Sequence, residues 1–247
     1  MAAKRRADQL LVEQGLAESR AKAQALILAG LVSAGGRRID KPGTALAEDI
    51  ELALAGRDHP WVSRGGVKLG FALDHFAIDP DGLTALDIGA STGGFTDVLL
   101  VRGVARVHAV DVGRGQLAWK LRQDPRVVVH EGINARYLSR AEIPDPIDLL
   151  TCDASFIGLA TVLPAPLALT AERASLVALI KPQFEAGPAE VGKGGVVRDP
   201  MVHRAVCERV AAWIGAQPGW RVVGIADSPL TGPAGNREFL IHARRGG

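Results

Sequence analysis

Hydrophobic and polar positions change their period along the chain. In the first 54 residues, apolar side chains recur at helical spacing over residues 7–15 and 19–30, and short strand patterns follow at residues 31–33, 37–39 and 50–54. Ser19 is typical of a helix N-cap, and Gly30 is typical of a helix end. The pattern predicts a small α+β module of two short helices followed by short strands.

Farther along, strand and helix patterns alternate, which favours a parallel sheet covered by helices. The predicted strands span residues 84–88, 106–111, 127–131, 147–152, 175–180, 221–226 and 238–243. The predicted helices span residues 95–102, 115–122, 159–169 and 201–216. This order predicts an α/β fold with a Rossmann-like, seven-stranded domain. We assign residues 1–59 to the small domain, 60–64 to a linker and 65–247 to the large domain.

Composition narrows the class of protein. The 247 residues are 47% hydrophobic and 23% charged, which is typical of a folded, soluble chain and excludes a disordered polymer. No uninterrupted apolar run reaches the roughly 20 residues that a membrane-spanning helix needs. The N-terminus lacks the apolar region of a signal peptide, and the two cysteines make no disulfide framework. We therefore expect a cytoplasmic protein with no membrane partner.

Charge is unevenly distributed, because the first 41 residues hold eight basic side chains and only four acidic ones. Such a basic module favours a polyanionic partner, most simply RNA, although a solvated charged face has the same pattern. The candidate RNA-binding residues are Arg5, Arg6, Arg20, Lys22, Arg37, Arg38, Lys41 and Arg64.

A glycine-rich turn follows the first predicted strand of the large domain and supplies the candidate cofactor site. It reads Gly89-x-x-x-Gly93-Gly94, which is not a dinucleotide fingerprint, and Asp87 inside the strand suits a cationic ligand. Asp111 ends the next strand, where a carboxylate can accept hydrogen bonds from ribose hydroxyls. This pairing resembles S-adenosylmethionine-dependent methyltransferases; the alternative is a turn that serves only the fold. The candidate binding residues are Asp87, Gly89, Ala90, Ser91, Thr92, Gly93, Gly94, Phe95, Asp111, Asn134 and Asp153, with Asn134 either near the adenine or only in a turn.

Four charged residues are candidates for catalysis. Asp153 and Lys181 follow the fourth and fifth strands, Lys68 precedes the first, and Glu238 begins the last. If that last strand is antiparallel, Glu238 returns to the edge that holds Asp153 and Lys181. Methyl transfer to a hydroxyl needs an oxygen held in line and help with its proton, which two lysines and two carboxylates can provide. Taken singly, a lysine at a strand end is more typical of a solvated terminus, and a glutamate that opens an edge strand is more typical of protective charge; the four together favour catalysis.

Two family resemblances join these features. The series Arg6-Ala7-Asp8, Ser19-Arg20 and Gly30-x-Val32 resembles the alpha-L RNA-binding module of ribosomal small-subunit protein S-four, apart from Ala34-Gly35, where that module favours a β-branched residue. The set of Lys68, Asp153, Lys181 and Glu238 is similar to the tetrad of RrmJ/FtsJ-type ribose methyltransferases.

The whole chain resembles the hemolysin A (TlyA) family of rRNA cytidine 2′-O-methyltransferases. The resemblance implies S-adenosylmethionine as the cofactor, and ribosomal RNA or ribosomal subunits as the partner. It also implies that Lys181 activates or orients the ribose 2′-hydroxyl, that Lys68 and Glu238 tune and position it, and that Asp153 holds the lysine and the methyl-donor region.

Three other functions compete with this interpretation. A nitrogen methyltransferase usually carries Asp/Asn-Pro-Pro-aromatic after the fourth strand, whereas this chain reads Asp153-Ala154-Ser155-Phe156. A non-catalytic RNA-binding or ribosome-assembly factor would not need the four charged residues. A membrane-lytic hemolysin would need an amphipathic or spanning helix that the sequence does not show. The histidines form no metal-ligand pattern, so we expect no metal.

Overall fold

The computed structural model describes residues 4–14, 16–17, 19–54, 59–232 and 235–246. The chain divides into two compact units, Met1–Pro60 and Trp61–Gly247. The predicted linker of residues 60–64 straddles this division. Gly15, the predicted end of the first helix, lies outside the described residues.

The N-terminal unit contains the two predicted helices, α1 (Ala7–Glu13) and α2 (Arg20–Leu28). The Ser19 hydroxyl accepts a hydrogen bond from the Lys22 amide, as expected of an N-cap. The predicted strands form an antiparallel sheet of β3 (Arg37–Arg38), β2 (Val32–Ala34) and β5 (Leu52–Leu54).

A second, two-stranded sheet in this unit pairs β1 (Lys4–Arg6) with β4 (Ala45–Ala47). The sequence did not predict it, because a strand of three basic residues has no apolar alternation to detect. The helices and the three-stranded sheet bury one small core that includes Leu11, Ala23, Ile27, Val32 and Leu52.

The C-terminal unit is built on one seven-stranded sheet with the order β11-β12-β10-β9-β6-β7-β8. Its strands are β6 (Thr84–Ile88), β7 (Arg106–Asp111), β8 (Val127–Glu131), β9 (Ile147–Cys152), β10 (Thr170–Ile180), β11 (Trp220–Asp227) and β12 (Phe239–Arg245). All seven predicted strands are confirmed. The strands from β6 to β10 run parallel, whereas β12 is antiparallel to both of its neighbours.

One predicted boundary of this sheet was wrong in a place that matters for the site. Glu238 does not begin the last strand but lies one residue before β12. Its carbonyl oxygen accepts a hydrogen bond from the Ser228 amide, which closes the connection from β11.

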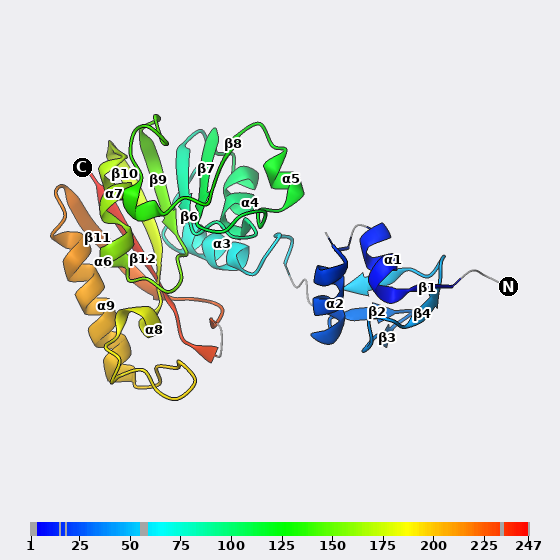
Figure 1. Ribbon diagram of the computed structural model, residues 1–247. Coiled ribbons are helices and arrows are strands. Elements are labelled where there is room, and N and C mark those ends of the chain that lie inside the picture. The colour runs from blue at the N-terminus through cyan, green and yellow to red at the C-terminus, as the bar shows by residue number, and fades with distance from the viewer. Residues whose placement is uncertain (1–3, 15, 18, 55–58, 233–234, 247) are drawn as a thin grey trace. The chain divides into compact units, whose positions relative to one another are not determined.

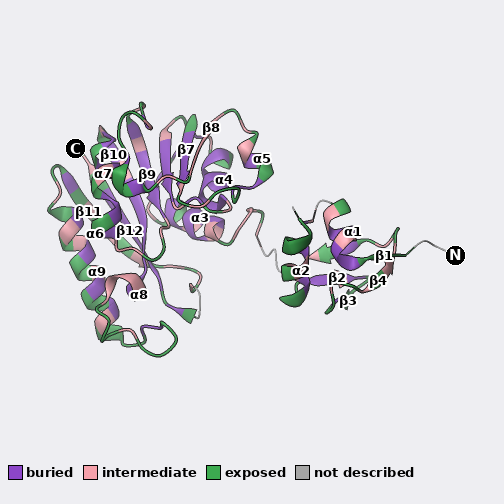
Figure 2. Cartoon of the chain, viewed as in Figure 1, coloured by how far each residue is buried: buried purple, intermediate pink, exposed green. Residues whose placement is uncertain are grey.

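Helices cover both faces of the sheet (Figure 1). One face packs against α3 (Gly65–His75), α4 (Gly94–Val101) and α5 (Trp119–Arg122). The other packs against α6 (Leu159–Val162), α7 (Pro164–Ala168) and α9 (Pro200–Gly215), and the shorter α8 (Pro182–Glu185) and 3-10 helix η1 (Ala135–Tyr137) lie in connections. Two predicted helices differ in extent: residues 115–118 of the first are not helical, and the second is interrupted at Leu163, with Pro164 beginning the new helix α7. Figure 2 shows the central strands buried between these layers.

The sequence missed α3, because Gly65, Gly66 and Gly70 lower its helix propensity. Two of these helix contacts need a small residue. A Cβ atom at Gly66 would lie 2.3 Å from Trp61, and one at Gly94 in α4 would lie 2.8 Å from the Gly66 amide nitrogen. Glycine therefore allows α3 and α4 to approach closely, at a cost in helix propensity.

The parallel strands place their carboxyl ends at one edge of the sheet, which we call the carboxyl edge. The connections that leave β6, β7, β9 and β10 there carry the glycine-rich turn, Asp111, Asp153 and Lys181. Open α/β sheets bind their ligands at this edge.

Candidate active site

The glycine-rich turn between β6 and α4 has a backbone conformation that residues with a side chain rarely adopt. Gly89 and Gly93 have φ angles of 79° and 97°, in the left-handed region that favours glycine. A Cβ atom at Gly89 would lie 3.0 Å from backbone atoms of Asp153 and Ala154. The two connections at the carboxyl edge can therefore meet only over a glycine.

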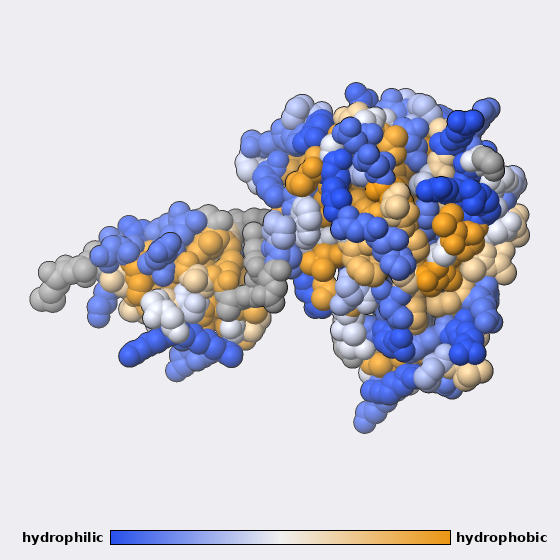
Figure 3. Space-filling model, turned by 180° about the vertical axis from the view of Figure 1, so that it is seen from behind, coloured by the Kyte–Doolittle hydropathy of each residue, from blue (hydrophilic) through white to orange (hydrophobic). Residues whose placement is uncertain are grey.

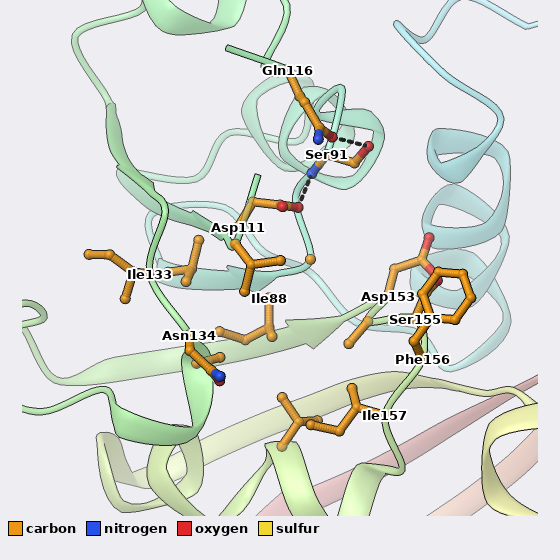
Figure 4. A pocket seen from close by; sticks show the side chains of 16 residues that line it. Ile88, Ser91, Asp111, Gln116, Ile133, Asn134, Asp153, Ser155, Phe156 and Ile157 are labelled. Atoms are coloured by element: carbon orange, nitrogen blue, oxygen red, sulfur yellow. Dashed lines mark hydrogen bonds between the residues drawn. The ribbon is translucent and has the colours of Figure 1, made fainter. Parts of the chain in front are cut away.

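A cavity of about 430 Å³ opens beside this turn (Figure 4). Asp111 lies in its wall and accepts hydrogen bonds from the Ser91 amide at 2.8 Å and the Gly113 amide at 2.7 Å. These contacts fix the carboxylate while leaving lone pairs for a ligand. Asn134 lines the cavity from the other side, and its side-chain oxygen accepts from the Arg136 amide at 3.1 Å.

A smaller cavity of about 150 Å³ continues along the turn toward α3. Both cavities are lined by Gly89, Ser91 and Asp153. Between them they account for nine of the predicted cofactor-binding residues, namely Gly89, Ala90, Ser91, Thr92, Gly94, Phe95, Asp111, Asn134 and Asp153. The sequence did not single out Gln116, Ile133 or Ile157, which also line the larger cavity, because nothing in their spacing marks them.

Asp87 has a different environment from the one expected of a ligand-binding residue. It lines neither cavity and is fully buried, and its oxygens accept hydrogen bonds from the Thr96 hydroxyl at 2.7 Å and the Thr151 hydroxyl at 3.0 Å. Burial raises the pKa of Asp87 to about 6, although these hydrogen bonds act in the opposite direction. The carboxylate thus ties β6 to α4 and β9 beneath the turn. Gly93 also lies outside both cavity walls, packed against Leu121.

The four candidate catalytic residues form two lysine–carboxylate pairs. Lys181 Nζ lies 2.7 Å from Asp153 Oδ1, and Lys68 Nζ lies 2.5 Å from Glu238 Oε2. All but Asp153 are buried, and the Asp153 side chain is 21% exposed because it faces the cavities. Charges withdrawn from water in this way need close partners, which each pair supplies.

Two features of the backbone bring the pairs to the same place. Ile180 pairs with Phe239 across β10 and β12, so the same register continued by one residue sets Lys181 opposite Glu238. Lys68 lies on α3, whose first residue Gly65 is close enough that a Cβ atom there would be 3.7 Å from Asp153 Oδ2. All four residues therefore gather at the carboxyl edge, beside the cavities.

The loop after β9 adds two polar and aromatic neighbours. The Ser155 hydroxyl accepts a hydrogen bond from Lys181 Nζ at 2.9 Å, and the Asp153 carbonyl oxygen accepts another at 3.1 Å. Phe156 lines the cavity yet is 90% exposed, and its ring lies 5.0 Å from that of Phe184. Trp61, in contrast, is half-buried and packs against Gly66 of α3.

The candidate RNA-binding cations of the N-terminal unit fall into two groups. Arg6 and Arg20 both reach the buried carboxylate of Asp8, at 2.9 and 3.4 Å, and the Arg6 guanidinium holds the pKa of Asp8 well below its usual range. Arg5 pairs with Glu13 and Glu48, and Arg38 pairs with Asp40. The exposed side chains of Lys22, Arg37 and Lys41 have no ion pair with any described residue. Figure 3 shows hydrophilic side chains projecting from the surface of this unit.

The remaining candidate cation, Arg64, precedes α3 in the C-terminal unit and donates a hydrogen bond to the Thr231 carbonyl oxygen at 3.2 Å. Within the described ranges, no group of three or more His, Cys, Asp or Glu side chains could hold a metal ion. The helices of those ranges include none that is long and apolar enough to cross a membrane.

Comparison with known proteins places both units. The FtsJ-like methyltransferase model matches residues 61–245, and the S4 domain model matches residues 5–49. The chain is 50% identical over 245 residues to the 16S/23S rRNA (cytidine-2′-O)-methyltransferase TlyA of Mycobacterium tuberculosis, covering 99% of this chain and 91% of the relative. It is 37% identical to Hemolysin A of Brachyspira hyodysenteriae, covering 96% and 98% of the two chains. A solved structure described as a candidate hemolysin, from Streptococcus thermophilus, aligns over 100% of this chain and 90% of that one, with 43% identity and a TM-score of 0.78.

The fold, the cavity at the carboxyl edge and the matched family model define an S-adenosylmethionine-dependent methyltransferase joined to an S4 domain. The relatives match both units in a single alignment that spans nearly the whole chain. The chain belongs to the TlyA family of FtsJ-like methyltransferases.

Proposed function

We propose that this chain transfers a methyl group from S-adenosylmethionine to the ribose 2′-oxygen of a cytidine in ribosomal RNA, 16S, 23S or both. The observation that carries the proposal is the convergence of two lysine–carboxylate pairs beside the cavity that contains Asp111 and Asn134. The names of the curated relatives support the substrate class.

The cavity suits the cofactor on its own chemistry. Its volume of about 430 Å³ lies in the range of roughly 300–1,000 Å³ that small-molecule sites occupy. Asp111 would accept hydrogen bonds from the ribose hydroxyls of the cofactor, Asn134 would lie on the adenine side, and the turn from Gly89 would follow the methionine moiety. When bound, S-adenosylmethionine supplies a sulfonium methyl that is open to nucleophilic attack.

The two pairs would act on the RNA hydroxyl. Lys181 is held by Asp153 and Ser155, so its ammonium group has a fixed direction from which to orient or activate the 2′-oxygen. Lys68 on α3 and Glu238, one residue before β12, would tune and position the nucleophile. Because Lys68, Lys181 and Glu238 are buried from water, each of these electrostatic contacts is stronger than it would be in solvent. Phe156, exposed at the cavity wall, is available to stack on a splayed base.

The N-terminal unit would bind the RNA through its basic surface. Lys22, Arg37 and Lys41 are exposed and are therefore available to phosphates, whereas Arg6 and Arg20 also stabilise the buried Asp8. Lys22→Gln and Arg37→Gln should weaken RNA binding and flatten its salt dependence by about 1 per lost phosphate contact. Unchanged binding at several salt concentrations would count against this assignment.

The decisive experiment is tritiated-methyl transfer to separated ribosomal subunits and to free rRNA, followed by nucleoside mass spectrometry. We expect 2′-O-methylcytidine as the product. Methylation of a base nitrogen would establish the nitrogen-methyltransferase alternative, and absence of both S-adenosylmethionine binding and transfer would favour a non-catalytic RNA-binding factor.

Lys181→Met tests the tetrad. Transfer should fall by about 100-fold or more, as for loss of general acid–base help, while calorimetric binding of S-adenosylmethionine persists. Lys120→Met is the matched control, because Lys120 also pairs with a buried aspartate, Asp97, at 2.8 Å but lines neither cavity. Equal turnover of the two variants would remove Lys181 from the mechanism.

A further inference from the structure

A third cavity, of about 370 Å³, lies at the edge of the sheet opposite the carboxyl edge. The parallel strands begin there and β12 ends there, so it is remote from the catalytic candidates along every strand. Its lining residues are Leu83, Asp148, Arg173, Ala174, Ser175, Arg244, Arg245 and Gly246. The proposed methyl-transfer chemistry uses none of these residues.

The wall of this cavity is strongly basic, with three arginines and one carboxylate. Arg245 donates to the Thr170 hydroxyl at 2.9 Å, and Asp148 Oδ2 accepts from the Thr84 amide at 3.0 Å. Arg173 and Arg244 are exposed and have no ion pair with any residue in the described ranges. Their charge is therefore left for an external anion.

The strand register adds a fourth cation beside the cavity. Arg221 on β11 lies directly opposite Arg244 on β12, and like charges in such a cross-strand pair are destabilising. The positive charge of this pair also affects a buried side chain. His242, buried two residues before Arg244, has its pKa lowered to about 4, first by burial and then by Arg244 and Arg221. Arg221 and Arg244 thus add to the positive charge of a cavity wall to which Asp148 contributes a carboxylate.

We propose that this cavity binds a phosphate group. The planar guanidinium fork matches phosphate oxygens, and the Ser175 hydroxyl in the cavity wall can donate a further hydrogen bond. A bound phosphate beside Arg244 would also relieve its repulsion with Arg221. The cavity is larger than an inorganic phosphate needs, which suits a phosphate ester, either in an RNA backbone or in a free nucleotide.

The binding test uses the full chain with inorganic phosphate as the probe. Its melting temperature is followed by tryptophan fluorescence in phosphate and in chloride at equal ionic strength; all four tryptophans lie in the C-terminal unit. We expect a saturable rise with phosphate for the wild type and for Arg204→Gln, a control that removes an exposed arginine of α9. Arg244→Gln and Arg173→Gln should lose the rise. In chloride, Arg244→Gln should melt no lower than the wild type, because the repulsion with Arg221 is gone, so the lost response cannot reflect a damaged fold.

An RNA arm identifies the source of the phosphate and rests on the proposed function. The slope of log K against log salt is measured for rRNA binding by the cavity variants and by Arg204→Gln. If the slope is smaller by about 1 in the cavity variants, the phosphate that the cavity binds belongs to the RNA backbone. Equal slopes together with the phosphate response assign it to a free phosphate ester. No phosphate response together with equal slopes overturns the proposal and leaves the methyl-transfer function untouched.

Discussion

Asp87 offers a direct test of how the glycine-rich turn is supported. Burial raises its pKa from the ordinary 3.8 to about 6, so the folded chain retains a proton that the unfolded chain has already released. Between these two values the folded state binds more protons, and stability must fall as the pH rises. Asp87→Asn keeps the shape of the side chain and removes the charge.

The size of the effect follows from the pKa difference. At 1.36 kcal/mol per pKa unit, the ionised carboxylate costs the folded state about 3 kcal/mol, of which about 2 kcal/mol develops between pH 4.5 and pH 8. The unfolding free energy of Asp87→Asn, minus that of the wild type, should therefore rise by about 2 kcal/mol across this interval. The carboxylate is fully buried, so solvent screening does not reduce this figure.

The free energy of unfolding of Asp87→Asn must be compared with that of the wild type at each pH, because the titration of His242 changes stability in the opposite direction. Its pKa is lowered by burial to about 4, so the unfolded chain takes up the proton first and stability rises with pH between about 4 and 6.5. His242 is present in both proteins and cancels in the difference.

Urea unfolding followed by tryptophan fluorescence is the appropriate assay, because the four tryptophans report only on the C-terminal unit. Thr151→Val supplies a second variant: it removes one hydrogen bond to the carboxylate and should steepen the pH dependence. Parallel stability curves for Asp87→Asn and the wild type from pH 4.5 to pH 8 would refute the reasoning.

Three further results are expected. Burial raises the pKa of Cys152 to about 12 and that of Cys207 to about 11, so little reactive thiolate is present at pH 8. Iodoacetamide should therefore label Cys207 slowly and Cys152 only after unfolding. Rapid labelling of native Cys152 would contradict this. Asp8→Ala should destabilise the N-terminal unit by about 1–3 kcal/mol, because it removes the charged hydrogen bonds to Asp8. Hydrogen exchange should become faster in residues 4–54 and stay unchanged in residues 61–245. Asn236→Ala should speed hydrogen exchange in residues 195–197, because its buried amide accepts from the Val197 amide and donates to the Gly195 carbonyl; unchanged exchange there would count against this tether.

The strands of the sheet could be predicted because β-branched and apolar runs stand out between turns, as in residues 127–131 and 147–152. Helix α3 could not be predicted, since its glycines serve packing contacts with Trp61 and α4 that spacing along the chain does not reveal. The extra length of β10 before residue 175 was missed for a related reason: its polar start pairs with β9 only through an irregular register.

Part of the site could be predicted, because the carboxyl ends of parallel strands lie at the same edge of the sheet. This reasoning placed Asp111, Asp153 and Lys181 together, and the structure has all three at the carboxyl edge. It could not show which way a strand residue faces, so Asp87 was assigned to the ligand although it faces Thr96 and Thr151. Nor could spacing show that Arg6 and Arg20 share one buried carboxylate, because that contact depends on how α1 and α2 pack.

The reversal of a single strand decides whether the four charged residues can meet. β12 spans seven residues, so the six steps between its ends, at about 3.3 Å each, separate them by about 20 Å. A parallel β12 would carry Glu238 to the opposite edge, near the arginines of the third cavity, and would leave Lys68 buried without a carboxylate partner. Because an uncompensated buried charge costs several kcal/mol, the Lys68–Glu238 pair favours the antiparallel arrangement energetically as well as geometrically. The same contact that completes the proposed site therefore also helps to specify the topology of the sheet.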